Sequence, residues 1–435
     1  MSSYAQTLKR QLIGLIRQMA DNPEQFSKCP GKDFTRTRKL GMERTLSILL
    51  AMEGKSLNNE LLNYFCYTEP PSTSAFVQSR AKLHPNTLPS LFQKFVASQK
   101  SPNFFRGFRL LAADGSTLQI PSNPSDVDSC ITCRKGQWPI NLLHLTAIYD
   151  LCNLTYSDAI VEGGRSVNER AALCRMIMRS DIEKAILLAD RGFESFDLLA
   201  HIQQKGWKFL FRIKDKSGIA AGLDLPQDTN FDIPFELRIT SRRTNYLQSL
   251  LTDRNRYKFV HHSKFDYAGL ATDHDGFFHL CFRIVRLTIS DSLTETLITN
   301  LDRDNFQVST LKKLYAMRWG IETSFRKLKY ALGLLHFHAK KVENIHQEIF
   351  ARLIMYNFYE LITSHTIIHS KNRKYAYTVN FSVAAHICRQ FFCGNVSPPL
   401  LEALLLKYIL PIRPNRSYPR VAKTKGVVSF AYRMA

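Results

Sequence analysis

Between residues 108 and 214 the sequence carries a series of short apolar runs, and their order constrains the fold more than any other feature. Three runs with strand character come first, and a helix, a strand, a second helix and a last strand follow. In order, the segments are FRLLAAD (108–114), LLHLTAIYD (142–150), LTYSDAIVEG (154–163), NERAALCRMIMRS (168–180), KAILLAD (184–190), FDLLAHIQQKG (196–206) and KFLFRIK (208–214). This order predicts an α/β fold built on one sheet.

The segments on either side predict different structure. Residues 6–19 and 42–52 have apolar residues three and four positions apart, which is the helical period. Four more strand-like runs lie between residues 215 and 302, mostly joined by polar loops: FELRIT, RYKFVHH, FHLCFRIVRLTI and ETLITNL. We interpret that region as a β-rich insertion in the α/β fold. A chain of 435 residues also exceeds the usual size of a single domain.

The charge balance favours a polyanionic partner. The chain has 59 Lys and Arg against 37 Asp and Glu, a formal net charge of +22, and a pI near 9.6. Residues 70–113 and 403–435 contain no carboxylate. Such stretches suit contacts with nucleic acid phosphates, although two solvated basic faces would give the same pattern.

Other features exclude several classes of protein. Nine cysteines lack the spacing of a disulfide framework, and the first residues lack the apolar core of a secretory signal, which favours the reducing cytoplasm. The most apolar neighbourhood, residues 349–368, is broken by charged residues, so we expect no membrane span. No GxxxxGK[ST] motif occurs, which argues against ATP-driven chemistry.

A turn and a helix near residue 74 form a candidate DNA-contacting element. The turn TEPPSTS (68–74) ends in Ser and Thr residues that can cap the helix SAFVQSRAKL (74–83). This helix would expose Gln78, Arg80 and Lys82 after a helix and a turn. A helix-turn-helix reader of DNA is one interpretation, and an ordinary pair of helices is the other.

Two carboxylates stand at the ends of apolar strand-like runs, Asp114 in LLAADGS and Asp190 in ILLADRG. Groups at the carboxyl ends of neighbouring strands share a crevice, so adjacent strands would bring these acids together. Paired carboxylates can hold Mg²⁺. Taken alone, either Asp is more often a turn former, before Gly115 in one case and before Arg191-Gly192 in the other.

The helix predicted from about residue 308 past residue 329 carries a third acid. At about 100° per residue, Tyr315, Arg318, Glu322 and Lys329 fall within an arc of roughly 60°, at the edge of an apolar stripe. An ion-pair ladder would explain Arg318 and Glu322, which are four residues apart, but not the other two.

Binding of a metal ion and of phosphate groups would explain why these four residues line up. Glu322 would be the third metal-binding carboxylate, and Arg318 and Lys329 would neutralise phosphates along about 21 Å of helix. Tyr315 could donate to a phosphate or stack on a base. Further candidate DNA contacts are Arg326, Arg80 and Lys82.

The spacing Tyr315-x2-Arg318-x3-Glu322-x6-Lys329 resembles the Y-R-E-K signature of DDE transposases of bacterial insertion sequences, the group called insertion sequence family 4. The segments Asp114-Gly115 and ADRGF (189–193) are similar to that family's two aspartate motifs. The resemblance covers roughly residues 110–335, and DFTRTRKL (33–40) and SAFVQSRAKL look similar to the family's DNA-binding region.

The resemblance implies a ribonuclease H-like catalytic core in which Asp114, Asp190 and Glu322 bind two Mg²⁺ ions, with Mn²⁺ as an alternative. Water would cut one strand at the end of the element, and the freed 3′-OH would then attack DNA. In relatives with this signature the attack forms a hairpin, while Tyr315, Arg318 and Lys329 hold phosphates and a displaced base. Some relatives stack that base on a Trp in the insertion. Here the three tryptophans are Trp138, Trp207 and Trp319, so Phe277, Phe278, another aromatic residue or none would serve.

The expected division of the chain follows from the resemblance and the pattern of elements. It comprises a helical N-terminal DNA-binding domain (1–105), the first part of the catalytic core (106–214), the β-rich insertion (215–302), the rest of the core (303–365) and a basic C-terminal region (366–435). The implied partners are double-stranded DNA, as terminal inverted repeats and target, and a second copy of the chain in the synaptic complex. The implied location is the bacterial cytoplasm, in association with the nucleoid.

Two alternative functions stay open, and a second metal site has weak support. A DNA-binding protein derived from a transposase could retain the fold without cutting, and another nuclease could share the core. The lone pair Cys130-x2-Cys133 would need further ligands to bind zinc, and His144 is the nearest candidate.

Overall fold

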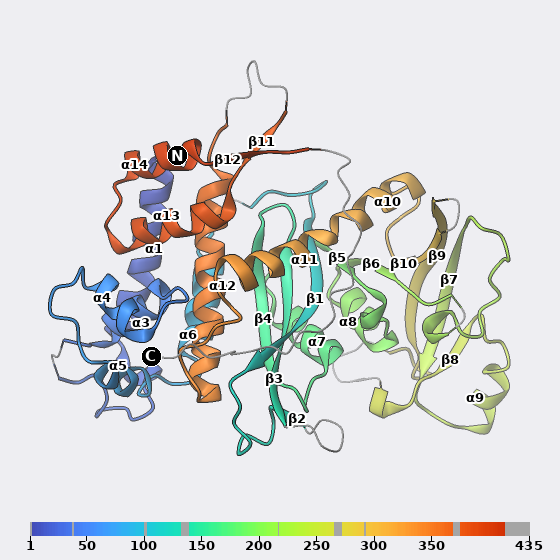
Figure 1. The fold of residues 1–435 in the computed structure, drawn as a ribbon. Coiled ribbons are helices and arrows are strands. Elements are labelled where there is room, and N and C mark those ends of the chain that lie inside the picture. The colour runs from blue at the N-terminus through green and yellow to red at the C-terminus, as the bar shows by residue number, and fades with distance from the viewer. Residues whose placement is uncertain are drawn as a thin grey trace.

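The computed structural model describes residues 2–36, 39–99, 102–131, 139–215, 217–264, 272–290, 293–368 and 375–413. It is a mixed α/β structure with a large twisted sheet at its centre (Figure 1). Helices from the two ends of the chain gather at one side of the sheet, and the strands of residues 231–299 lie at the other.

Helices dominate the first hundred residues, as the apolar periodicity predicts. They are α1 (Ser2–Ala20), α2 (Pro23–Phe26), α3 (Met42–Ala51), α4 (Leu57–Tyr64), α5 (Thr73–Arg80) and α6 (Thr87–Ala97). The predicted cap before α5 is confirmed, because the Ser72 hydroxyl accepts a hydrogen bond from the Ala75 amide at 3.2 Å.

The strands form a ten-stranded sheet within the described residues, in the order β2-β3-β1-β5-β6-β10-β9-β7-β8, with β4 also paired to β3. Their bounds are β1 (Arg109–Ile120), β2 (Cys130–Ile131), β3 (Ile140–Asp150), β4 (Thr155–Gly163), β5 (Ala185–Ala189), β6 (Lys208–Arg212), β7 (Phe231–Thr240), β8 (Tyr257–Phe259), β9 (Phe278–Ser290) and β10 (Leu293–Thr299). The predicted β-rich region thus extends the same sheet, because β10 pairs with β6.

The remaining elements cover the sheet or follow it in the chain. The helices are α7 (Glu169–Arg179), α8 (Phe196–Gln204), α9 (Asn245–Leu250), α10 (Val308–Met317), α11 (Trp319–Arg326), α12 (Val342–Ser364), α13 (Phe381–Cys393) and α14 (Pro398–Lys407). Short 3-10 turns occur at Arg191–Phe193, Gly218–Ala220 and His262–Lys264, and β11 (Tyr377–Val379) pairs with β12 (Ile409–Pro411). Of the predicted basic C-terminal region (366–435), residues 369–374 and 414–435 lie outside the described residues.

Alternation along the strands divides the core into two layers. In β5 all five side chains are buried, as expected for a strand covered on both faces. Ile186 and Leu188 join the core under α11 and α12, whereas Leu187 and Ala189 join the core under α7 and α8. Successive side chains point to opposite faces, so the even-numbered residues of β5 enter one layer and the odd-numbered residues enter the other.

Helix α12 is the centre of the first layer. Buried residues occur all around it, and it contacts α3, α6, α13 and β4. Helices from both ends of the chain therefore share one hydrophobic core with the sheet. None of the helices among the described residues is long and apolar enough to cross a membrane.

Arg80 corrects one sequence prediction, because it belongs to this core and not to a DNA-facing surface. It is 1% exposed. Its guanidinium donates to Glu348 Oε1 at 2.8 Å, to Gln347 Oε1 at 3.1 Å and to the Asn344 carbonyl at 2.6 Å. All three partners belong to α12, so Arg80 anchors α5 to the central helix.

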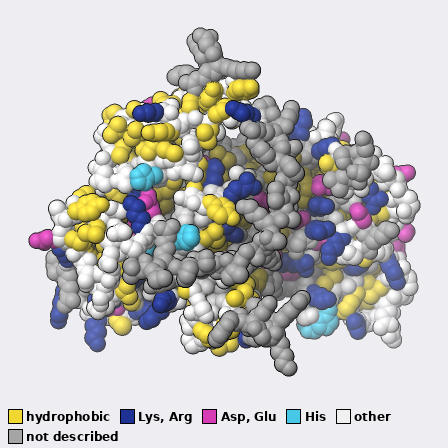
Figure 2. Space-filling model, viewed as in Figure 1, with side chains coloured by type: hydrophobic (Ala, Val, Ile, Leu, Met, Phe, Trp, Pro, Cys, Tyr) yellow, Lys and Arg dark blue, Asp and Glu magenta, His cyan; other side chains and the backbone are white. Residues whose placement is uncertain are grey.

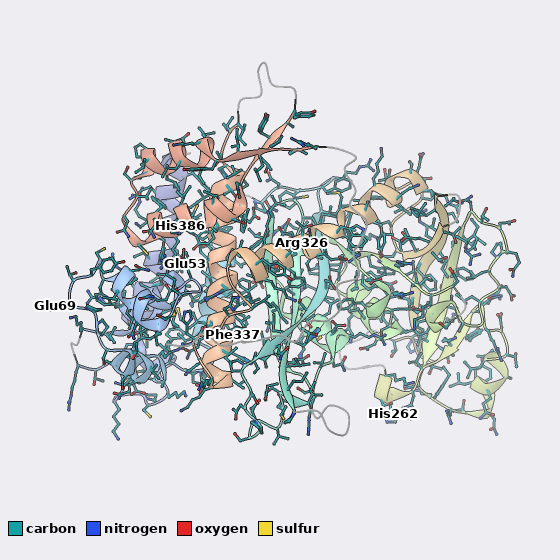
Figure 3. All side chains as sticks on the ribbon, viewed as in Figure 1. Glu53, Glu69, His262, Arg326, Phe337 and His386 are labelled. Carbon is teal, nitrogen blue, oxygen red and sulfur yellow. The ribbon has the colours of Figure 1, made fainter. Side chains whose placement is uncertain are left out.

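A second group of charged and polar side chains joins α13 to the N-terminal helices. Arg389 donates to Glu60 Oε2 at 3.1 Å and lies 3.2 Å from Glu53 Oε2. His386 Nδ1 is 3.0 Å from Glu53 Oε1, and Figure 3 places these two side chains beside each other. The contacts bring residues from opposite ends of the chain together.

Candidate active site

The two aspartates lie side by side, as predicted. β1 and β5 are parallel neighbours, and Ala113 pairs with Ala189. Asp114 and Asp190 each follow the paired alanine directly, at the end of the parallel ladder. One detail of the prediction is wrong: the strand does not end at Asp114, because β1 continues to Ile120 through its antiparallel pairing with β3.

Asp190 ends its strand and caps a 3-10 turn. Its Oδ1 accepts a hydrogen bond from the Arg191 amide at 2.5 Å, which orients the carboxylate at the strand end. Burial raises the pKa of Tyr315 to about 12, and the nearby charge of Asp190 contributes to the rise. Tyr315 stays a hydrogen-bond donor at neutral pH.

The helix with the third acid is interrupted, where the sequence predicts one continuous helix. α10 ends at Met317, α11 begins at Trp319, and a π-helical turn covers Lys327–Ala331. Arg318 keeps helical backbone angles between the two helices. The backbone from Tyr315 to Glu322 therefore keeps a helical course, whereas Lys329 lies in the π-helical turn and not in an α-helix.

Tyr315 and Arg318 are more buried than residues at the edge of an apolar stripe would be, at 6% and 4% exposure. Arg318 Nη2 donates to Glu322 Oε1 at 2.9 Å, and its guanidinium lies 5.0 Å from the Trp319 ring centre. Two buried donors here, Arg318 Nε and the Tyr315 hydroxyl, have no hydrogen-bond partner among the residues that the structure describes. Unsatisfied buried donors are costly, so they mark a place where a ligand oxygen would be stabilised.

Asp114 is linked to the same helix by its electrostatics. Burial raises the pKa of Asp114 to about 6, and Glu322 adds to the rise while Arg318 opposes it. Burial also lowers the pKa of Lys329, and Asp114 partly offsets that effect. Lys329 Nζ is 3.3 Å from the Thr117 carbonyl on β1. The sheet thus brings together Asp114, Glu322, Arg318 and Lys329.

The raised pKa of Asp114 has a consequence for stability. The folded chain holds a proton on the Asp114 carboxyl more tightly than the unfolded chain does. The protonated carboxyl therefore stabilises the folded chain fully below about pH 4, and this stabilisation is lost as the pH rises through about 6. Asp114→Asn removes that loss. In a chelator, we expect the melting temperature of Asp114→Asn to exceed that of the wild type more at pH 8 than at pH 4, and Asp304→Asn, at an exposed carboxyl, serves as the surface control. An equal difference at both pH values would contradict the raised pKa.

A side chain at position 115 would displace the pair His144–Glu169, a contact that the sequence does not indicate. A Cβ on Gly115 would lie 1.9 Å from Glu169 Oε1 and 2.4 Å from His144 Nε2, and these two groups are 2.7 Å apart. They cover β1 on the face opposite to Asp114, since neighbouring residues point to opposite faces. His144 is therefore engaged with Glu169 rather than with Cys130; Cys133 lies outside the described residues.

The other predicted DNA contacts differ in accessibility. Arg326 is exposed, and Figure 3 places it on α11 over the sheet. Lys82 is half-buried, with its ammonium 5.7 Å from the Phe34 ring centre. Figure 2 shows Lys and Arg side chains on this face of the molecule, near α11 and on the side of the β-rich region.

Comparison with known proteins assigns the chain to a protein family. A family model described as the transposase DDE domain matches residues 106–358, more than half of the chain and all three acids. The chain belongs to the DDE transposase family. A curated relative is the transposase InsG for insertion sequence element IS4 of Escherichia coli (strain K12), 20% identical over 431 residues, which cover 93% of this chain and 90% of the relative.

Among solved structures, the piggyBac transposase synaptic complex with hairpin DNA is similar at a TM-score of 0.49 and 9% sequence identity, over 92% of this chain and 81% of that one. That likeness is too weak to support conclusions about this transposase.

Membership in the DDE transposase family implies nuclease and transesterase activity and the use of divalent metal ions. The acids of this chain fit such ions, because carboxylate oxygens are the ligands that hard divalent cations prefer. A cation beside Asp114 would also offset the repulsion from Glu322 that raises its pKa.

The aromatic side chains that could stack on a base differ in their exposure to solvent. Phe277 and Phe278 are buried at 1% and 3% exposure, and Trp207 is buried at 1%. These residues therefore do not present a ring to solvent in this transposase. Trp319 is 53% exposed, while Trp138 lies outside the described residues.

Proposed function

We propose that this DDE transposase moves an insertion sequence by cut-and-paste transposition, with a ribonuclease H-like core as its catalytic unit. The proposal is supported by the neighbouring positions of Asp114 and Asp190 at the end of the parallel ladder between β1 and β5, with Glu322 on α11, which contacts β1. The strand order β4-β3-β1-β5-β6, with three antiparallel strands followed by two parallel ones, agrees with such a core.

Asp114, Asp190 and Glu322 would hold two divalent ions, Mg²⁺ or Mn²⁺. When bound, such ions activate an attacking oxygen and stabilise the leaving one in an in-line displacement. The ion pair with Arg318 keeps the Glu322 carboxylate oriented on α11, and the cap at Arg191 does the same for Asp190.

The signature residues would hold the DNA strand. The unpartnered Arg318 Nε and Tyr315 hydroxyl can donate to phosphate oxygens, and Lys329 can move from the Thr117 carbonyl to a phosphate. Arg326 and Lys82 are further contacts. Hairpin formation rests on the Y-R-E-K spacing alone.

The DNA partners would be the terminal inverted repeats and a target duplex. The helical region of residues 1–105 would contribute to end binding, and two copies of the chain would pair the two ends. The similarity to a transposase for insertion sequence element IS4 supports a role at an insertion sequence. The place of action would be the bacterial nucleoid.

The test is a nicking assay on labelled duplexes that carry the DNA ends flanking this gene. We expect strand cleavage at those ends with Mg²⁺ or Mn²⁺ and none with a chelator. Tight binding without metal-dependent cleavage would favour a DNA-binding protein derived from a transposase. Equal cutting of unrelated duplexes would favour a general nuclease.

Lys329→Ala tests the phosphate contact. Loss of one phosphate contact should weaken end binding about tenfold and make the plot of log affinity against log salt shallower by about 0.9. The control is Lys184→Ala, an exposed lysine just before the opposite end of β5, which should leave the slope unchanged. An unchanged slope for Lys329→Ala would count against the phosphate role.

A further inference from the structure

A separate cluster of side chains lies on the other side of the sheet, between α7 and α8. It consists of Cys174 on α7 and Asp197 and His201 on α8. Among the residues that the structure describes, these form the one group of three His, Cys, Asp or Glu residues whose potential ligand atoms all lie within 4.8 Å of one another. We propose that they bind one zinc ion, independently of the proposed transposition chemistry.

The distances suit a small tetrahedral ion. Cys174 Sγ is 3.9 Å from Asp197 Oδ2, and His201 Nε2 is 3.5 Å from Asp197 Oδ1. A zinc ion with bonds of about 2.0 to 2.3 Å separates its tetrahedral ligand atoms by about 3.3 to 3.8 Å. Small side-chain rotations therefore bring all three ligands to bonding distance.

The local sequence places the ligands there. Asp197 and His201 are four residues apart on α8, so they lie on the same face of that helix. α8 packs against α7. Cys174 of α7 lies in the core under these two helices, together with Leu173 and Ile177. The three side chains converge because the two helices cover the same face of the sheet (Figure 1).

Burial and ligand type favour zinc over a hard cation. Cys174 and His201 are 8% and 6% exposed, and the Asp197 side chain is 23% exposed. A thiolate, an imidazole and a carboxylate suit Zn²⁺, whereas Mg²⁺ prefers oxygen ligands alone. The exposed side at Asp197 leaves room for water as a fourth ligand.

The proposed ion would stabilise the support of the active site rather than take part in the reaction. α8 follows the turn that begins after Asp190, and α7 begins at Glu169, which covers Gly115 beside Asp114. An ion joining α7 to α8 would hold both of these segments, so its loss should lower the melting temperature.

The experiment uses the full chain, stripped with a chelator and dialysed against Zn²⁺ with excess Mg²⁺. We expect about one tightly bound zinc ion per chain by elemental analysis, a higher melting temperature with zinc, and proton release from the Cys174 thiol on binding. The dissociation constant for zinc should rise at least tenfold in Cys174→Ser and in Asp197→Asn.

The matched control is Cys130→Ser, which removes a thiol of the Cys130-x2-Cys133 pair and should bind zinc as the wild type does. Asp197→Asn keeps the proposal testable if Cys174→Ser fails to fold, because Asp197 is the most accessible ligand. Absence of bound zinc in the wild type, or wild-type zinc affinity in Asp197→Asn, would overturn the proposal. Loss of zinc in Cys130→Ser alone would place the ion at that thiol pair instead.

Discussion

Replacing Glu322 by Gln is expected to reduce metal-dependent strand cleavage about a thousandfold while end binding stays near the wild-type level. The change removes the charge of one proposed metal ligand but no proposed phosphate contact. Bound metal ions contribute several kcal/mol to such reactions, and each 1.36 kcal/mol is a tenfold change in rate. The measurement is the nicking assay, with binding followed on the same duplexes.

Glu43→Gln is the matched control. Glu43 also pairs with an arginine, at 3.0 Å from Arg17, but it lies on α3 in the N-terminal helical region. Glu43→Gln should cut bound duplex as the wild type does, because it removes no proposed metal ligand. Cleavage by Glu322→Gln at the wild-type rate, or equal loss of cleavage and binding, would contradict the assignment of Glu322 to the metal site.

Replacing Arg80 by Ala is expected to lower the free energy of unfolding by about 3 to 5 kcal/mol, because it leaves the buried Glu348 carboxylate without its cation. The Arg80 cation, followed by contacts with His338, outweighs burial and holds the pKa of Glu348 far below its ordinary value. Urea titration followed by circular dichroism measures the effect.

Arg17→Ala provides the comparison, since Arg17 forms an ion pair on the surface, with 65% of its side chain exposed. Such pairs contribute about 0 to 1 kcal/mol. If Arg80 were instead a DNA contact, Arg80→Ala would weaken DNA binding and leave stability unchanged. The two measurements therefore separate the structural role of Arg80 from the role predicted from the sequence.

The part of the fold that carries Asp114 and Asp190 was predictable because its signals are local. Each strand and helix between residues 108 and 214 has its own apolar pattern, and the order of elements limits the possible sheets. The extent of β1 was less predictable. Its second half, Asp114–Ile120, is specified by pairing with β3, and nothing within the strand shows that the Asp-Gly step is extended rather than a turn.

The roles of individual charged residues were harder to predict because their partners are distant in the sequence. Arg80 stands in an acid-free stretch, and its buried partner Glu348 is 268 residues away. Similarly, the helical projection placed Tyr315 and Arg318 together, but their burial depends on packing against the sheet. The adjacency of Asp114 and Asp190 was predictable because it follows from strand geometry alone.

The central position of α12 also has a consequence for how the chain is made. The N-terminal helices leave the ribosome first, yet the helix that completes their core is synthesised roughly 250 residues later, about 10 to 50 s at typical rates of translation. Until then their apolar faces stay uncovered. The growing chain therefore depends on protection from aggregation, and a messenger truncated before residue 342 would yield a product with an unfinished core.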